Sequence, residues 1–569
     1  MKRISAVFLS ALIVSVLSAC GGRASSSTPS SFSSPQAPLS PQTSYAHPVD
    51  ARRGENTLES YPDAVEIELS DDRITVDGEA ASTDPESSVY TANDIVFYLA
   101  DQGFTYGEGD ENDEHEQSEA DAHTVLHITE PGKYILSGTL SAGQIAVDLG
   151  EDAEEDPNAV VTLILDGIDV TCSVAPGVIF YNVYECGESD EDTATYEVDT
   201  SAAGANVIIA DGSVNNVNGS YVARIYKSYT LSEDGTEVVD NKKLHKYDAA
   251  FYSRKSMNVT GGEKGDGVLN INAENEGLDS ELHLTINGGG IYIKSGNDGI
   301  NTNEDYVSVT TVNGGLVDIT VTGETGEGDG IDSNGWLVIN GGTVIAAACS
   351  TSGDAGIDSD MGIYINGGNV CATGNMLDRI AGSDEAYAVF TFSDRQKGGS
   401  TYTLKNSDSE VVGEWTPNND FTYLIVSGYE ITEGTYTLWQ GDTQFAGSTG
   451  AGGFGGHFGG GMRPDGSDFI PPEGFNPENM TLPEGMARPD GGKLPEIPEG
   501  GMPAMPEGAA PPEIPEGMQK PDGVRSGRGR MGSKGGQQNF SELSTEFEIK
   551  AGGSTFMNVS PVKAVTTAA

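Results

Sequence analysis

The sequence predicts an all-β fold, a right-handed parallel β-helix (β-solenoid) with a disordered Gly/Pro-rich insertion near the C-terminus. The tripeptide Asn-Gly-Gly recurs at Asn287, Asn313, Asn340 and Asn366, so the repeat is 26 or 27 residues long. Short runs in which apolar and polar residues alternate precede and follow each turn, as strands do. No helix-period segment of ten or more residues intervenes. Three short strands per coil fit this step, whereas a propeller blade needs about 40 residues.

The apolar residues around the turns fall into register when the repeats are aligned. Leu284 aligns with Leu337 and Ile363 before the turn. The column directly before the turn contains Ile286, Val312, Ile339 and Ile365, and a column after the turn contains Ile291, Val317, Val344 and Val370. One repeat cannot bury its own apolar face, so consecutive repeats are expected to stack. Strand-like runs at 124–128, 133–140, 144–149, 159–165 and 206–210 extend this architecture back to about residue 120.

The first 19 residues predict a lipoprotein signal peptide. Lys2 and Arg3 precede a mostly apolar run from 4 to 17, which is short for a membrane-spanning helix of about 20 residues. The run ends in Leu-Ser-Ala-Cys, which resembles a bacterial lipobox, so lipidation of Cys20 is expected. The alternative is a plain signal peptide with an incidental cysteine. The expected location is therefore the cell envelope, on its extracytoplasmic side, with the protein lipid-anchored.

Composition divides the rest of the chain. Residues 20–60 predict a Ser/Pro-rich disordered tether, because low hydrophobicity and repeated proline do not build a core. Residues 61–446 are assigned to the parallel β-helix. Residues 447–538, with repeated Pro-Glu-Gly units, predict the disordered insertion. Residues 539–569 hold a last strand, expected to return to the folded body, and a tail.

The charge balance restricts the partners. The chain has 87 Asp and Glu against 30 Lys and Arg, a net charge of −57. Phosphate contacts need clustered cations, so a nucleic-acid binder is excluded. Attraction to an anionic membrane surface is disfavoured, and we expect a monomer that meets the membrane only through its lipid anchor. Of the five cysteines, Cys172 and Cys186 are a candidate disulfide across a short loop, with free thiols as the equal alternative.

A second repeated motif lies between the strand runs. It reads EGLDS at 276–280, DGINT at 298–302, DGIDS at 329–333 and AGIDS at 355–359. Its apolar residues are expected to point inward, and its polar residues to form two columns. The inward residues are Leu278, Ile300, Ile331 and Ile357, and the columns are Glu276, Asp298 and Asp329, and Asp279, Asn301, Asp332 and Asp358. Adjacent strands lie about 4.8 Å apart, where two carboxylates repel by about 3.5 kcal/mol at an effective dielectric constant of 20.

These columns need protons or cations, and calcium is the natural cation because it takes six to eight oxygen ligands in loose geometry. Asp266, from the partial copy GDGVLNI, and Asp354 complete the predicted ligand set. The alternatives are a solvated acidic ladder and side chains that cap turns by accepting backbone hydrogen bonds. His115, His123 and His127 lie in or near an acidic loop and could suggest a transition metal, but a solvated loop is the preferred interpretation.

The run from Ala249 to Val309, with EGDGIDSNGWLVINGGTV (327–344) and AGIDSDMGIYINGG (355–368), resembles the clostridial cell-surface carbohydrate-binding domain family. That family is a calcium-binding right-handed parallel β-helix, similar in shape to pectate lyases. The resemblance covers roughly residues 120–380. It implies calcium held by acidic residues of the DGI[DN] type. It also implies a polysaccharide ligand, such as a plant cell-wall or acidic glycan.

Polysaccharide binding is the leading hypothesis. Trp336 and Tyr292, with Tyr364, are the predicted aromatic platforms, although Trp336 could instead cover a neighbouring loop. The second hypothesis is a calcium-dependent lyase, in which Lys264 or Lys294 would be the base. Negative neighbours favour the charged ammonium, so catalysis is the weaker interpretation and no catalytic residue is assigned. The third hypothesis is a calcium-stiffened structural rod.

Overall fold

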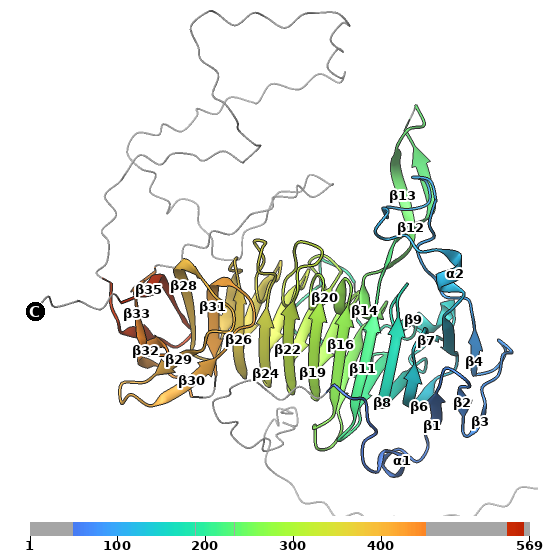
Figure 1. Cartoon of the computed structure of the whole chain (residues 1–569), viewed down its shortest axis with the longest axis horizontal. Helices are drawn as coiled ribbons and strands as arrows, with labels where there is room; N and C mark the ends of the chain where they lie inside the picture. The colour runs from blue at the N-terminus through green and yellow to red at the C-terminus, as the bar shows by residue number, and fades with distance from the viewer. Residues whose placement is uncertain (1–48, 188, 233, 429, 451–542, 563–569) are drawn as a thin grey trace, which may run out of the picture.

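The computed structural model describes residues 49–450 and 543–562, apart from 188, 233 and 429. The described chain is nearly all β, which confirms the predicted class (Figure 1). Its helices are α1 (Thr57–Ser60), α2 (Gln117–Ala120) and a 3-10 turn at Glu151–Glu155. No helix in this part of the chain is long and apolar enough to span a membrane. The signal peptide, Cys20, most of the tether and residues 451–538 of the predicted insertion lie outside the described residues.

Three ladders of parallel strands form the body. Ladder I contains β10 (Ala205–Ile209), β15 (Met257–Gly261), β18 (His283–Ile286), β21 (Val309–Val312), β23 (Trp336–Ile339) and β25 (Gly362–Ile365). Ladder II contains the second half of β8 (Val161–Cys172), whose first half pairs with β10 in ladder I. It continues with β11 (Val214–Gly219), β16 (Val268–Ala273), β19 (Gly290–Ser295), β22 (Leu316–Val321), β24 (Thr343–Ala347) and β26 (Asn369–Gly374). Ladder III contains β5 (Thr124–Ile128), β7 (Gly143–Asp148), β9 (Val178–Asn182), β14 (Ala249–Ser253), β17 (Glu276–Ser280) and β20 (Ile300–Thr302).

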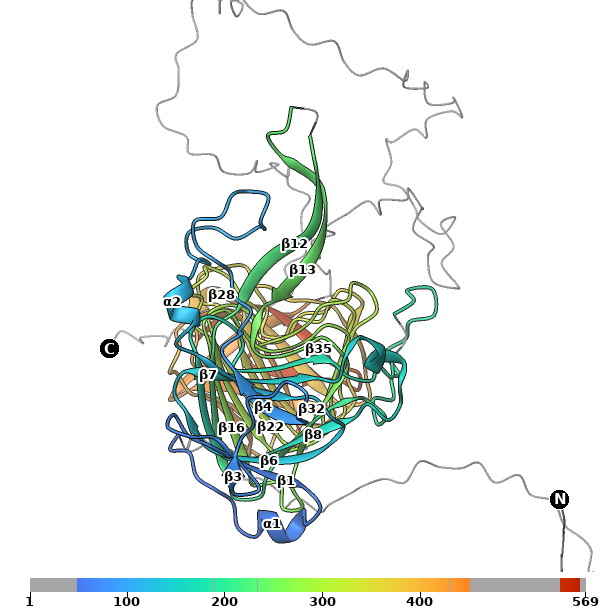
Figure 2. The same ribbon diagram turned by 90° about the vertical axis from the view of Figure 1, so that its right-hand side faces the viewer.

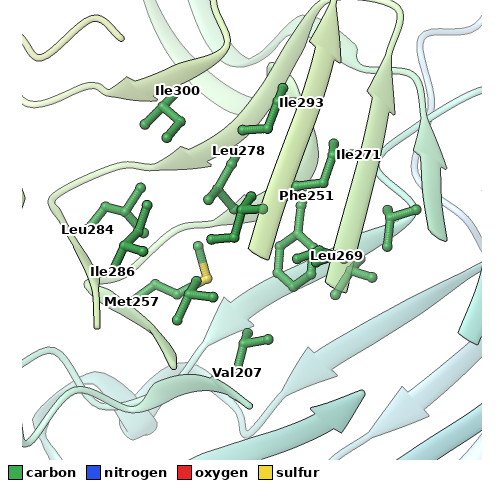
Figure 3. Packing of buried hydrophobic residues seen from close by; sticks show 14 of the residues in the cluster. Val207, Phe251, Met257, Leu269, Ile271, Leu278, Leu284, Ile286, Ile293 and Ile300 are labelled. Carbon is green, nitrogen blue, oxygen red and sulfur yellow. The ribbon is translucent and has the colours of Figure 1, made fainter. Parts of the chain in front are cut away.

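The strand register agrees with the alignment of the repeats. In ladder I, Leu337 pairs with Ile363, and in ladder II, Val317 pairs with Val344. Ladder III continues beyond β20 through bridges from Ile300 to Ile331 and from there to Ile357. One apolar cluster collects the inward residues of all three ladders, as the packed side chains in Figure 3 illustrate. Each repeat therefore contributes the same positions to one continuous core.

The Asn-Gly-Gly turns connect ladder I to ladder II. Each asparagine amide donates to the side-chain oxygen of the equivalent asparagine one coil before, at 2.9 Å along the series Asn287, Asn313, Asn340 and Asn366. The second glycine of the turn has a positive φ, 82° at Gly315, and a Cβ there would collide with the backbone of the preceding turn. The motif therefore combines a side-chain ladder with a backbone that only glycine adopts readily.

Antiparallel strands pair with terminal strands at both ends of the body, where they cover exposed sheet edges. At the first end, β4 (Val89–Ala92) pairs with β5, and β2 (Thr75–Val76) and β3 (Glu79–Ala80) extend β1 (Val65–Leu69), which lies parallel to β6 (Gly132–Leu140). At the other end, β27 (Ile380–Ser383) is the last parallel strand, and β31 (Phe421–Ser427) pairs antiparallel with β26. The remaining part of 61–446 therefore does not continue the parallel ladders.

The strands of the closing body have their own aromatic-rich core. They are β28 (Tyr387–Gln396), β29 (Tyr402–Lys405), β30 (Val411–Trp415), β32 (Gly434–Gln440), β33 (Thr443–Thr449), β34 (Phe547–Ile549) and β35 (Ser554–Pro561). Both β34 and β35 pair with strands that precede residue 450, which confirms the predicted return of the last strand. A separate hairpin, β12 (Val222–Leu231) with β13 (Val238–Tyr247), projects from the body (Figures 1 and 2).

Truncating one inward residue tests the shared core. Ile331 is fully buried between Ile300 and Ile357, so we expect Ile331→Ala to lower the free energy of unfolding by about 2–5 kcal/mol. Denaturant unfolding of the full chain measures it, with the exposed Glu263→Ala as the control. A change at Ile331 no larger than that of the control would contradict a stacked core.

Candidate functional site

The register brings most of the predicted acidic residues into the expected columns. Asp279 pairs with Asn301 across β17 and β20. Asp332 and Asp358 continue this column, because the residues before them, Ile331 and Ile357, bridge in the same register. All four apolar residues of the motif are fully buried, so the polar residues between them face outward at one corner of the body.

A carboxylate triad that includes a residue missed by the sequence analysis lies at the start of the columns. Asp248, Glu276 and Asp279 each offer an oxygen atom, and these atoms all lie within 4.8 Å of one another. Their exposed fractions are 6%, 5% and 0%. Asp248 directly precedes β14, whose Ala249 pairs with Glu276. The ammonium group of Lys246 forms an ion pair with Asp248.

Burial and mutual repulsion make this triad costly when it is fully ionised. Burial first, and then neighbouring carboxylates, raise the pKa of Glu276 and of Asp279 well above the ordinary range. Burial alone would lower the pKa of Lys246, but Asp248 outweighs it and the pKa is raised. Lys246 therefore stays charged, and one ammonium faces three carboxyl groups.

Oxygen atoms without hydrogen-bond partners remain at this corner. Asn303 donates to both carboxylate oxygens of Asp279 at 2.9 Å, and Asn301 donates to the Asn303 side-chain oxygen at 3.1 Å. Glu276 Oε2 and Asn301 Oδ1 are buried with no hydrogen-bond partner among the described residues. Buried acceptors of this kind are costly unless something donates to them or ligates them.

Further along the first column the carboxylates cap backbone amides, as the alternative interpretation predicted. The N–H of Asp329 donates to Asp298 Oδ1 at 2.6 Å, and the N–H of Ala355 donates to Asp329 Oδ1 at 2.5 Å. These three residues occupy equivalent positions in successive coils. Asp354 accepts from the Gly328 N–H at 2.7 Å. The caps satisfy one oxygen per carboxylate, and burial still raises the pKa of Asp298 to about 7.

The second column ends in a further carboxylate group. Burial, followed by repulsion from neighbouring carboxylates, raises the pKa of Asp332 to about 7 and that of Asp358 to about 8. Asp378 is among the neighbours in both cases, and its Oδ2 atom is buried with no hydrogen-bond partner in the described chain. Asp378 lies outside the DGxD repeats, so the sequence analysis missed it.

The prediction of Asp266 as a ligand in these columns is wrong. Asp266 is exposed in the turn between β15 and β16 and accepts from the Gly212 N–H at 2.8 Å. Val268 pairs with Gly290, so GDGVLNI aligns with the Asn-Gly-Gly turn and not with the acidic motif.

The predicted disulfide between Cys172 and Cys186 is also wrong. All four described cysteines are free. Cys172 ends β8 before the chain enters β9, and Cys186 lies beyond the end of β9. The five residues of β9 span about 13 Å, whereas a disulfide needs Cα atoms within about 7 Å.

The predicted aromatic platforms lie on two different faces. Tyr292 is half-buried on the outward side of β19 in ladder II. Trp336 is outward on β23 in ladder I but only 8% exposed. It belongs to an apolar cluster with Val309 and Val338, against which Ala194, Val198, Met361 and Tyr364 pack. The alternative prediction, a tryptophan beneath a neighbouring loop, is therefore confirmed. Tyr364 lies on β25 of the same ladder and stacks on Tyr196, with ring centroids 4.3 Å apart.

A groove of about 580 Å³ follows the outward face of ladder I. Consecutive strands contribute one outward residue each to its floor. In order along the ladder these residues are Asn206, Asn258, Thr285, Thr311 and Val338. Tyr364 pairs with Val338 on the next strand and lies beyond the lining of the groove. The asparagines of the turns line one wall, and residues 196–201 line the other. The floor changes from amides and hydroxyls to the apolar Val338 along its length.

The candidate lysines and histidines are not assembled around the carboxylates. Lys264 is exposed in the same turn as Asp266. Lys294 lines a separate hollow of about 260 Å³ with Glu274 and Glu324. His123 is buried against the Glu119 carbonyl oxygen, and His127 pairs with Asp94. Among the described residues, the group close enough to hold a metal is the triad of Asp248, Glu276 and Asp279.

Comparison with known proteins identifies the family. The family described as carbohydrate-binding domain-containing protein matches residues 122–411. The chain belongs to this family. The matched range contains most of the three ladders, both acidic columns and the groove, and it confirms the resemblance found in the repeated motifs.

Two further proteins are similar to this chain. A carbohydrate-binding domain-containing protein of Acetivibrio thermocellus is 28% identical over 171 residues, which are 30% of this chain and 45% of the relative. The chain therefore matches less than half of that relative's length. The structure of a polysaccharide lyase-like protein from C. thermocellum, a gadolinium derivative, is 20% identical with a TM-score of 0.30, over 54% of this chain and 93% of that one.

The raised carboxyl pKa values predict a stability that falls with pH. The folded pKa values of Asp298, Asp332 and Asp358 lie above ordinary carboxyl values, so their stabilising contribution is complete at low pH and is lost as pH rises through about 7 to 8. In metal-free buffer we expect the melting temperature to fall as the pH rises from about 4 to about 8, with no further loss from these groups at higher pH. Calorimetry should show a flatter profile for Asp358→Asn and an unchanged one for the exposed Asp408→Asn. A wild-type profile that rises with pH would contradict this.

Proposed function

We propose that this protein is a lipid-anchored extracellular module that binds polysaccharide, with calcium held at the acidic columns of a right-handed parallel β-helix. The family supports carbohydrate binding in general. The observation that carries the proposal is the groove on ladder I, an elongated hollow with a floor of regularly spaced amide and hydroxyl groups. The three ladders of stacked parallel strands support the helical architecture.

The groove is suited to a neutral polysaccharide. Thr311 and the turn asparagines Asn287 and Asn313 offer donors and acceptors to sugar hydroxyls, and equivalent positions on neighbouring strands lie about 4.8 Å apart. Glu197 and Asp199 lie on its wall, and none of the described residues that line it is a lysine or arginine. With a net charge of −57 on the chain, a polyuronate would be repelled from this groove.

Calcium fits the corner formed by ladder III. The triad of Asp248, Glu276 and Asp279 is a hard-oxygen donor set. The orphaned oxygens of Glu276 and Asn301 would gain a partner. The columns would also lose their mutual repulsion. Asp298, Asn301, Asp329, Asp332, Asp354 and Asp358 continue the acidic columns beyond the triad, and the carboxylates among them would add to the field that attracts the cation. A bound ion would stiffen the coils and take no part in sugar contact.

The geometry gives less support to a lyase. A base beside the metal should lose its proton near neutral pH. Lys246 is the lysine next to the triad, and its pKa is raised. Lys264 and Lys294 lie elsewhere. The purely structural rod does not account for the polar groove.

Glycan retention tests the groove. We expect the full chain to be retained on a neutral plant cell-wall polysaccharide and to bind polygalacturonate more weakly. Thr311→Arg should weaken binding by about tenfold or more, because it fills the floor of the groove. Asn272→Arg, on the exposed face of ladder II, is the matched control and should bind as wild type. Equal affinities of the two variants would contradict the assignment.

Calcium titration tests the corner. We expect calcium to raise the melting temperature of the metal-free protein, since a ligand stabilises the state that binds it. Asp279→Asn should weaken calcium binding by about tenfold or more, whereas Asp266→Asn should leave it unchanged. Isothermal titration calorimetry measures both. Wild-type protein that takes up no calcium, or equal affinity in the two variants, would refute the assignment.

A further inference from the structure

A strap of chain lines one side of the groove and covers the aromatic residues beyond its apolar end. Residues 189–201 follow β9 and precede β10, and they run over the outward face of ladder I. Ala194 and Val198 pack against the cluster of Val309, Trp336 and Val338. The strap reaches strands that lie far along the ladder from β10, where it rejoins the body.

The contacts of the strap are those that a sugar chain would make. The Tyr196 ring stacks on Tyr364 with an interplanar angle of 21°. The Thr200 hydroxyl lies 2.7 Å from both Asn258 Oδ1 and Thr285 Oγ1. Stacking on an aromatic face and hydroxyl contacts to the polar floor are the two interactions by which the groove would recognise a polysaccharide.

The strap is also poorly matched to the surface that it covers. Its sequence SDEDTATYEVDTS has five carboxylates and no cation, and Tyr196 remains 37% exposed. No strand is formed by its residues. Such a segment opens at a lower free-energy cost than the ladders beneath it, because few buried contacts must be broken.

We propose that Trp336, Val338 and Tyr364 form an aromatic subsite of the groove, which the strap occupies in the free protein and a bound polysaccharide takes over. The proposal rests on the proposed function and names where the bound chain extends. Ring faces of tryptophan and tyrosine supply large apolar contact at low entropic cost. The apparent affinity for polysaccharide is then the affinity of the open form multiplied by the fraction of molecules in which the strap is open.

Weakening the strap tests this subsite. Tyr196→Ala removes the stack and Thr200→Val removes the hydroxyl contacts. We expect the double variant of the full chain to bind the neutral polysaccharide about three- to tenfold more tightly than wild type. Adding Tyr364→Ala should abolish that gain. Tyr229→Ala, on the exposed outer part of β12, is the control and should leave affinity unchanged.

Tryptophan fluorescence gives a readout that needs no glycan. With Trp415 and Trp439 replaced by Phe, acrylamide should quench Trp336 more strongly in the strap variant than in the matched parent. Unchanged quenching would overturn the proposal.

Comparing the polysaccharide affinities of the wild type and the strap variant distinguishes an error in the proposed subsite from an error in the proposed function. Wild-type binding that the strap variant leaves unchanged or weakens would overturn the subsite but not the groove. Binding that appears only in the strap variant would support both. No binding by either protein would overturn both.

Discussion

The structure depends on the register of parallel pairing. Each coil places the same sequence position above its counterpart in the coil before, so any residue in the repeat becomes a column. An inward aliphatic residue such as Ile300 becomes part of a continuous core. An asparagine becomes one member of an amide ladder in which each side chain donates to the last. The same geometry places the carboxylates of successive repeats next to one another in a column.

Carboxylate columns are the costly consequence of this register, and the chain lowers the cost in three ways. Lys246 pairs with Asp248 at the start of the columns. Backbone amides of the following coil cap Asp298 and Asp329. Raised pKa values leave protons on the remaining groups unless a cation replaces them. A calcium ion would do so without distorting the coils, because it tolerates irregular oxygen geometry. The cation site and the groove would then lie on different faces of one rigid frame.

The features that could be predicted from the sequence are those that recur in successive repeats. The paired columns, the inward residues and the upstream strands follow from periodicity alone, since register makes one repeat informative about the next. Asp248 was missed because the β12–β13 hairpin interrupts the repeat just before it. The signal was present: Phe251 and Ser253 pair with Leu278 and Ser280 of the acidic motif. Asp266 was assigned wrongly because its Asp-Gly pair is similar to the start of the acidic motif, although the pair occupies the position of the Asn-Gly-Gly turn.

Long-range features could not be predicted in this way. The alternation of inward and outward residues correctly predicted that Trp336 faces outward. A strap that lies more than a hundred residues earlier in the sequence covers it. The alternation gives no information about such a contact. The prediction of a disulfide between Cys172 and Cys186 was wrong for a related reason. A short separation in sequence can still span a full strand.

Hydrogen exchange with and without a bound neutral polysaccharide tests the central claim most directly, namely that ladder I carries the ligand. We predict that binding slows amide exchange in β18, β21 and the turns at Asn287 and Asn313. The exposed face of ladder II, around β16 and β19, should be unaffected. Protection confined to ladder II, or spread equally over both ladders, would contradict the account.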